Sequence, residues 1–135
     1  MKKLFVALIV LASTARADSI SGTWAGTLRL QSNSCFSKFA HQRLSVRHRV
    51  ARAGSSVSLQ TSGGFRFSGG LNRLGGFTVR RFSRSGSPIA GCGRGVFLIY
   101  SSIRGNSAQV FASDGIYCGT RGYCTAEYRG ILARR

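Results

Sequence analysis

The chain has 135 residues and a formal net charge of +17, with 20 lysines and arginines against three acids. A chain of this length builds one domain with a modest hydrophobic core. Its two histidines and three carboxylates provide few groups for general acid–base catalysis. The composition therefore argues against an enzyme and against a bound cofactor, and it favours association with anionic partners at low ionic strength.

The N-terminus has the three parts of an export signal. Two lysines follow the first methionine, residues 4–12 form an apolar run of nine, and Ala15 and Ala17 place small residues before a cleavage site. Nine residues are far fewer than the ~20 that cross a bilayer, which disfavours a transmembrane anchor. Asp18 stands where a lipoprotein would have cysteine. We therefore predict a signal peptide over residues 1–17 and a periplasmic or extracellular protein without a membrane span.

Cleavage would leave residues 18–135 as a single domain. It removes three basic residues and no acid, so the mature charge is +14, and 16 of the 17 remaining basic residues are arginines. Arginine is always protonated and binds phosphate, sulfate and carboxylate groups through two hydrogen bonds. Anionic polymers are therefore candidate partners, although the same residues would also keep the domain soluble.

The mature sequence predicts strands and no helix. Eighteen glycines are spread along it, and glycine is unfavourable inside helices. Apolar and polar residues instead alternate with a period of two, and clusters of glycine, serine and asparagine separate the alternating runs. In chain order, the predicted strands cover residues 23–30, 43–50, 56–60, 65–67, 77–79, 96–100, 108–112 and 124–132.

The second run shows the alternation most clearly. Its inner face is apolar apart from one histidine and consists of Leu44, Val46, His48 and Val50. A histidine in such a row is expected to be a hydrogen-bonded core or pocket residue rather than half of a catalytic dyad. Phe65, Phe67 and Phe77 are likewise expected to fill the core.

The remaining polar residues form no recognised catalytic motif. Asp114 precedes a glycine and is expected to lie in a turn. Alternation places Glu127 on the outer face. The glycines of residues 91–95 lie close together, but no predicted helix follows them, so a dinucleotide site is excluded.

Eight strands at near-even spacing, joined mostly by short turns, are typical of a sandwich or an up-and-down barrel. Short hairpins make sequential strands pair with one another. Eight meandering strands can also close on themselves and remove exposed edges. We therefore predict an all-β fold, an eight-stranded antiparallel up-and-down (meander) barrel stabilised by disulfides, with an open sandwich as the alternative.

Four cysteines in an exported chain predict two disulfides, for which three pairings exist. In a meander with alternating strand directions, all four fall at one end of the barrel: Cys35, Cys92, Cys118 and Cys124. A zinc site of four thiolates would need closely spaced pairs, and none occurs. We expect Cys118–Cys124 as the local pair and Cys35–Cys92 as the other, with Cys35–Cys118 as a reasonable alternative.

The start of the first strand, Gly22-Thr23-Trp24, resembles the opening of the calycin barrels, which include the lipocalins and avidins. The strand pattern is also similar to that of small secreted bacterial barrel proteins. The calycin resemblance implies that Trp24 plugs one end of the barrel. It further implies that a late arginine, Arg129 or Arg134, stacks on that ring. The avidin pocket uses several tryptophans and this chain has one, so biotin binding is not implied.

Six arginines form a candidate face for anionic polymers. Three lie on the polar side of the second strand and three cluster at the end of the fifth: Arg43, Arg47, Arg49, Arg80, Arg81 and Arg84. Arginines two positions apart on a strand are ~6.6 Å apart along it, which suits an extended anionic chain. The phenylalanines next to these arginines suit a single-stranded polyanion, because its bases could stack on their rings. The alternative is that these arginines only keep the outer surface soluble.

Two functions remain open on the sequence alone. The first is an exported, non-enzymatic small binding barrel with a pocket for a small apolar ligand or a surface for a protein partner. The alternative is a cationic surface protein that acts on envelope glycans, lipopolysaccharide or nucleic acid.

Overall fold

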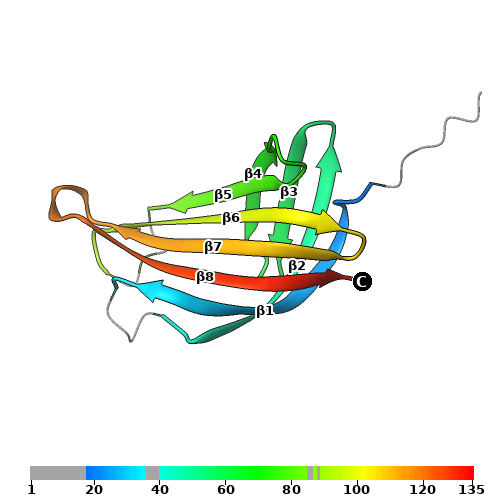
Figure 1. Ribbon diagram of the computed structural model, residues 1–135. Helices are drawn as coiled ribbons and strands as arrows, with labels where there is room; N and C mark the ends of the chain where they lie inside the picture. Colours follow the sequence, from blue (N-terminus) through cyan, green and yellow to red (C-terminus); the bar gives the residue numbers. More distant parts are fainter. Residues whose placement is uncertain (1–17, 36–39, 85–86, 88) are drawn as a thin grey trace, which may run out of the picture.

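Eight antiparallel strands close into a barrel in this computed structural model, which describes residues 18–35, 40–84, 87 and 89–135 (Figure 1). The strands are β1 (Gly22–Asn33), β2 (Arg43–Ala53), β3 (Ser56–Thr61), β4 (Arg66–Leu71), β5 (Phe77–Ser83), β6 (Gly93–Arg104), β7 (Ser107–Tyr117) and β8 (Tyr123–Arg134). The predicted signal peptide, residues 1–17, lies outside the described residues. Among the residues described, no helix is long and apolar enough to cross a membrane.

Each strand pairs with the next, and β8 returns to pair with β1. The predicted all-β, eight-stranded antiparallel meander barrel is therefore confirmed, and the open sandwich is wrong. A short 3₁₀ helix (Gly119–Arg121) lies in the connection between β7 and β8.

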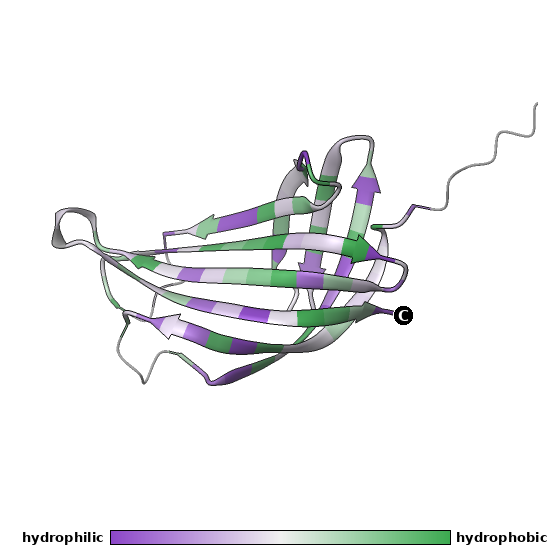
Figure 2. Cartoon of the chain, viewed as in Figure 1, coloured by the Kyte–Doolittle hydropathy of each residue, from purple (hydrophilic) through white to green (hydrophobic). Residues whose placement is uncertain are grey.

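The two-residue period of the sequence decides which side chains enter the barrel. In β2, His48 and Val50 are buried whereas Arg47 and Arg49 are exposed. Alternating apolar and polar positions are visible along the strands in Figure 2. β7 is longer than predicted, so Asp114 lies within the strand and lines the interior. The expectation that Asp114 occupies a turn is therefore wrong, because strand pairing continues past it.

Two glycines allow neighbouring strands to approach closely. A Cβ atom on Gly69 of β4 would lie 1.9 Å from the carbonyl oxygen of Thr78 in β5. A Cβ atom on Gly130 of β8 would lie 2.3 Å from the carbonyl oxygen of Thr27 in β1, at the seam where the barrel closes. Both distances are far shorter than a real carbon–oxygen contact, so only glycine permits this backbone geometry.

One end of the barrel, here called the tryptophan end, is filled by aromatic side chains. Trp24 is fully buried, and its Nε1 donates a 2.8 Å hydrogen bond to the carbonyl oxygen of Ile20. The Trp24 ring meets Tyr100 edge-on, with 6.0 Å between ring centroids. Phe77 stacks on Tyr100 at 4.3 Å. These large rings pack against one another and form an aromatic layer at this end of the barrel.

Arg134 of β8 joins the chain start to this aromatic layer. Its guanidinium carbon lies 5.5 Å from the centroid of the Trp24 ring. The same guanidinium donates hydrogen bonds to the carbonyl oxygens of Asp18 and Ser21, at 2.9 and 3.3 Å. Of the two candidate arginines, Arg134 therefore contacts Trp24, whereas Arg129 lies over the ring of Phe111.

The opposite end, here called the cysteine end, carries two disulfides, Cys35–Cys124 and Cys92–Cys118. All four cysteines lie at this end, as the strand directions predicted. The predicted pairs Cys118–Cys124 and Cys35–Cys92 are wrong, and so is the alternative pairing of Cys35 with Cys118. The presence of two disulfides fits folding in an oxidising compartment.

Strand register explains the observed pairing. β1 pairs with β8 as far as Asn33 opposite Ala126, so the cysteines two residues beyond that pair meet. β6 pairs with β7 from Gly93 opposite Tyr117, so the cysteines that flank that pair meet. Each disulfide therefore joins two strands just beyond the last pair of residues in their ladder. The spacing of the cysteines along the sequence does not show which strands are paired, so it could not predict these bonds.

Candidate functional site

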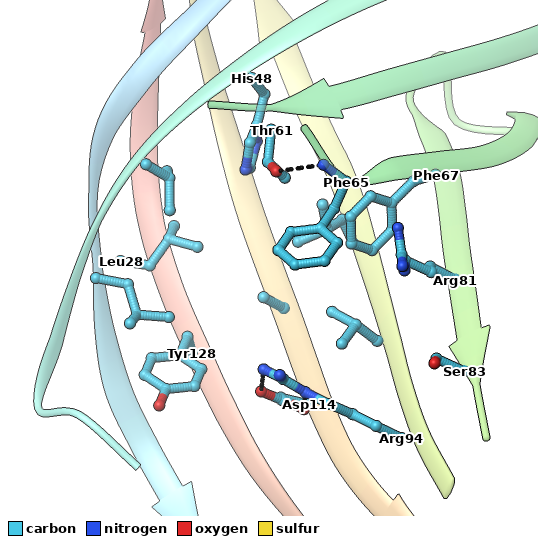
Figure 3. Close-up of a pocket in the computed structure, with 15 residues that line it drawn as sticks. Leu28, His48, Thr61, Phe65, Phe67, Arg81, Ser83, Arg94, Asp114 and Tyr128 are labelled. Carbon is cyan, nitrogen blue, oxygen red and sulfur yellow. Dashed lines mark hydrogen bonds and ion pairs between the residues drawn. The ribbon is translucent and has the colours of Figure 1, made fainter. Parts of the chain in front are cut away.

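The barrel encloses a cavity of about 270 Å³ on the cysteine side of the aromatic layer (Figure 3). Nine of the fifteen residues that line it are aliphatic or aromatic: Leu28, Leu44, Val46, Phe65, Phe67, Val96, Leu98, Ala112 and Tyr128. Most of these side chains are aliphatic and leave the centre of the barrel open, whereas the large rings at the tryptophan end fill it. An apolar cavity inside a barrel is a common place for a small ligand.

His48 forms a polar part of the cavity floor. It is 3% exposed, and its Nδ1 is hydrogen-bonded to the hydroxyl group of Tyr100. Burial lowers the pKa of His48 to about 4 and raises the pKa of Tyr100. Both side chains are therefore neutral at neutral pH. The prediction of a hydrogen-bonded core or pocket histidine is confirmed.

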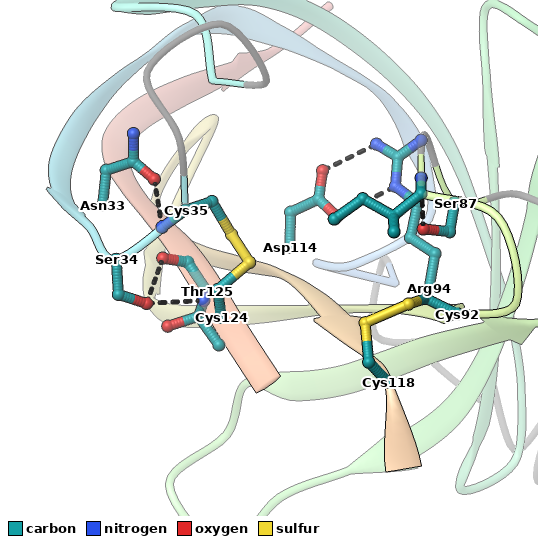
Figure 4. Close-up of a disulfide and its surroundings, with 11 residues drawn as sticks. Asn33, Ser34, Cys35, Ser87, Cys92, Arg94, Asp114, Cys118, Cys124 and Thr125 are labelled. Atoms are coloured by element: carbon teal, nitrogen blue, oxygen red, sulfur yellow. Dashed lines mark hydrogen bonds and ion pairs between the residues drawn. A yellow bond between two sulfur atoms is a disulfide. The ribbon is translucent and has the colours of Figure 1, made fainter. Parts of the chain in front are cut away.

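Arg94 and Asp114 form an ion pair where the cavity reaches solvent at the cysteine end. Arg94 Nε donates to Asp114 Oδ1 at 2.9 Å, and Arg94 Nη2 donates to Asp114 Oδ2 at 2.6 Å. Their side chains are 44% and 29% exposed, and Figure 4 shows the pair between the two disulfides. Sequence reasoning missed this pair. The sequence did contain a signal for it, because alternation places Arg94 and Asp114 at inward-facing positions of their strands.

Arg81 also enters the cavity, from β5 (Figure 3). Alternation along β5 places Phe77 and Arg81 on the inner face and Arg80 on the outer face. The guanidinium carbon of Arg81 lies 4.5 Å from the centroid of the Phe65 ring. The prediction that Arg81 joins Arg80 and Arg84 in one outer cluster is therefore wrong, because adjacent side chains of a strand point to opposite faces.

Phe65 lies at the mouth of the cavity, so the expectation that it fills the core is wrong. It is 54% exposed and belongs to the turn before β4. The Thr61 amide donates to the Phe65 carbonyl oxygen at 2.9 Å, and the Phe65 amide donates to Thr61 Oγ1 at 3.2 Å. These bonds hold the turn and place the ring against Arg81. Phe67 and Phe77 are buried as predicted.

The other candidate residues for anionic polymers lie on the outer surface in two groups. Arg43, Arg47 and Arg49, here called the β2 arginines, are exposed on β2, and Arg80 and Arg84 are exposed at and after β5. β3 and β4 separate the two groups. A polar groove of about 370 Å³ lies beside two of the β2 arginines. The six arginines therefore do not form one continuous face.

Sequence reasoning also missed an aromatic row on the outer surface at the cysteine end. Phe82, Tyr117 and Tyr123 are 64%, 39% and 73% exposed, and the two tyrosine rings stack with 5.9 Å between centroids. Gly95 and Gly115 lie beneath Tyr117, because a Cβ atom on either glycine would meet that ring. The sequence did contain a signal for this row, because alternation along each strand places the three aromatic residues on the outer face, as it does Gly95 and Gly115.

Within the described ranges, no group of three or more histidine, cysteine or acidic side chains is placed to hold a metal ion. No protein-family model, curated protein or solved structure matches this chain. The cavity and the charges at its mouth are therefore the basis for a functional assignment.

Proposed function

We propose that the mature chain is an exported, non-enzymatic binding barrel that holds a small, largely apolar ligand in its interior. The observation that carries this proposal is the cavity of about 270 Å³, which has apolar walls and reaches solvent at the cysteine end. Ligand pockets are typically concave, mostly apolar and largely preformed. Water gains few hydrogen bonds from such walls, so its displacement by an apolar ligand is favourable.

The cavity volume limits the size of the ligand. An apolar cavity of ~150 Å³ holds one benzene molecule. A cavity of about 270 Å³ therefore suits a compact molecule of roughly ten to twelve heavy atoms. Pockets for drug-sized ligands have volumes of ~300–1,000 Å³. A long lipid chain would fit poorly.

The two disulfides support a preformed site. They join β1 to β8 and β6 to β7 at the cysteine end. A rim that is ordered before the ligand arrives loses little conformational entropy on binding. We propose a calycin-type arrangement, with Trp24 at the closed end and ligand entry at the cysteine end. Disulfide formation and the predicted signal peptide support an exported location.

Filling the cavity with a side chain tests the proposal. Val46 and Ser45 are neighbours in β2, but Val46 lines the cavity and Ser45 is exposed on the outer surface. Val46→Trp is therefore expected to block the ligand, and Ser45→Trp is the matched control. The probe is cinnamamide, a neutral molecule of suitable size, and the readout is the backbone amide NMR spectrum of the labelled mature protein.

Saturable shifts of cavity residues are expected in the parent and in Ser45→Trp, and their loss is expected in Val46→Trp. Thermal unfolding of both variants checks that they are folded. Shifts that survive Val46→Trp would contradict binding in the cavity. The absence of saturable shifts in the parent would contradict the proposed function itself.

The β2 arginines support a second candidate function, the binding of anionic polymers. All three are exposed, and a polar groove of about 370 Å³ lies beside Arg47 and Arg49. Each phosphate-like contact adds about one unit of salt dependence. Changing the three residues to glutamine should then flatten the slope of log affinity for heparin against log salt by roughly two to three units. Equal slopes for parent and variant would contradict this function.

A further inference from the structure

We propose that the ligand of the cavity is an organic anion, whose charged group binds Arg81 and whose apolar body lies inside the barrel. This inference rests on the proposed ligand-binding function and adds the chemical class of the ligand. It is carried by the balance of charge in the cavity and by the position of the Arg81 side chain.

The charges that face the cavity do not cancel. Among the residues that the structure describes, two guanidinium groups, those of Arg81 and Arg94, line it together with one carboxylate, that of Asp114. Both oxygens of Asp114 accept hydrogen bonds from Arg94. The chain has two other acids, and both are remote from the cavity: Asp18 lies at the tryptophan end and Glu127 accepts a hydrogen bond on the outer face of β8. The chain therefore offers no acidic side chain to Arg81.

Arg81 is held in a position from which it can bind a ligand at the mouth. Its side chain is half-buried, and the guanidinium carbon lies over the Phe65 ring at 4.5 Å. The turn that contains Phe65 is fixed by its two hydrogen bonds with Thr61. Contact with the ring occupies one face of the guanidinium group. The N–H groups along its edge are the donors that bind a carboxylate through two parallel hydrogen bonds.

An anion is favoured at this point over a neutral or cationic ligand. A partly buried positive charge with no acidic side chain beside it is poorly solvated, so an anionic group that pairs with it recovers part of that cost. The apolar wall lowers the local dielectric and strengthens the attraction relative to bulk water. His48 contributes no charge at neutral pH, because its pKa is lowered to about 4. An amphipathic acid matches this site, because its anionic group would pair with Arg81 and its apolar body would contact the apolar wall.

The cavity volume restricts this acid to a compact one. About 270 Å³ accommodates roughly ten to twelve heavy atoms, of which the acidic group occupies three or four. Aromatic or short aliphatic carboxylates, sulfonates and phosphates have this form. An extended polyanion does not, so this site is separate from the outer surface of the β2 arginines.

Two probes with one skeleton test the proposal. Cinnamate and cinnamamide have the same size and shape, but only cinnamate is charged. NMR titration of the mature protein at neutral pH is expected to give a dissociation constant for cinnamate about tenfold or more below that for cinnamamide, because a charge-assisted bidentate contact is added. Arg81→Met is expected to abolish this preference, because the guanidinium group that distinguishes the charged probe from the neutral one is then absent.

Arg80→Met is the matched control, since it removes the same charge from the outer face of the same strand. It is expected to keep the preference for cinnamate. Equal affinities of the parent for the two probes would overturn the anion proposal while leaving the ligand-binding function standing. A preference that persists in Arg81→Met, or that disappears equally in Arg80→Met, would overturn the role of Arg81. No saturable binding of either probe would overturn both proposals.

A conservative variant keeps the test decisive if Arg81→Met does not fold. Arg81→Lys retains the charge but lacks the planar fork of donors. It is expected to keep only part of the preference for cinnamate. Full retention in Arg81→Lys would contradict the bidentate contact.

Discussion

Truncation of Trp24 is expected to destabilise the barrel more than any other single change at the tryptophan end. The side chain is fully buried, and Trp24→Ala should cost about 3–5 kcal/mol, the usual range for a large buried aromatic residue. The change also removes the donor that binds the Ile20 carbonyl oxygen at 2.8 Å. A carbonyl group left without its partner adds a desolvation cost, which places the expected loss in the upper half of that range.

Two further variants separate the contributions of the indole hydrogen bond and of the arginine over the indole ring. Trp24→Phe keeps an aromatic ring but loses the donor, so a smaller loss of roughly 1–3 kcal/mol is expected. Arg134→Ala removes the guanidinium over the indole ring and should destabilise more than Arg135→Ala at the exposed chain end. Domains of this size have a total stability of ~5–15 kcal/mol, so Trp24→Ala should remain folded but marginal.

The measurement is guanidinium chloride unfolding followed by far-ultraviolet circular dichroism, because the chain has no second tryptophan to report by fluorescence. In the parent, Trp24 emission should be blue-shifted and protected from soluble quenchers. A loss below about 1 kcal/mol in Trp24→Ala would refute closure of the barrel by this residue, since that is no more than an average point mutation costs. A native parent with fully quenchable emission would refute it as well.

Three further predictions concern pH, redox state and processing. Stability should fall by about 2 kcal/mol from pH 7 to pH 5, because burial holds the folded pKa of His48 near 4, below the ~6.5 of the unfolded chain, so that the unfolded state binds more protons in this window. His48→Gln should lack this component, and an identical pH profile of chemical unfolding would contradict it. The Cys35–Cys124 bond spans 89 residues and the other disulfide spans 26, so removal of the first should cost ~4–5 kcal/mol and removal of the second ~3–4 kcal/mol. Peptide mapping under non-reducing conditions checks the pairing on which this order depends. N-terminal sequencing of the exported protein should begin at Asp18, and an intact first methionine would be the opposing result.

Much of the barrel follows from residue alternation, which is local. The inner face of β2 is apolar and its outer face carries the β2 arginines, so the sequence predicts both faces. Reversal of direction at each hairpin also places the four cysteines at one end. The inward direction of Arg81 follows from the same period once Phe77 is placed inside. Charged residues are nevertheless expected on the outer face of a barrel. Because Arg80 and Arg81 are adjacent and both charged, the sequence analysis assigned both of them to that face.

The sequence by itself determined the strand number, the faces of most strands and the end at which the cysteines lie. Only the tertiary structure decided which strands meet. The partners in each disulfide, the ion pair of Arg94 with Asp114 and the contact of Arg81 with Phe65 all join residues from different strands or turns. The open cavity likewise depends on which side chains share a layer of the barrel. The physical reason is that alternation belongs to a single strand, whereas register and closure are set by the packing of all eight strands together.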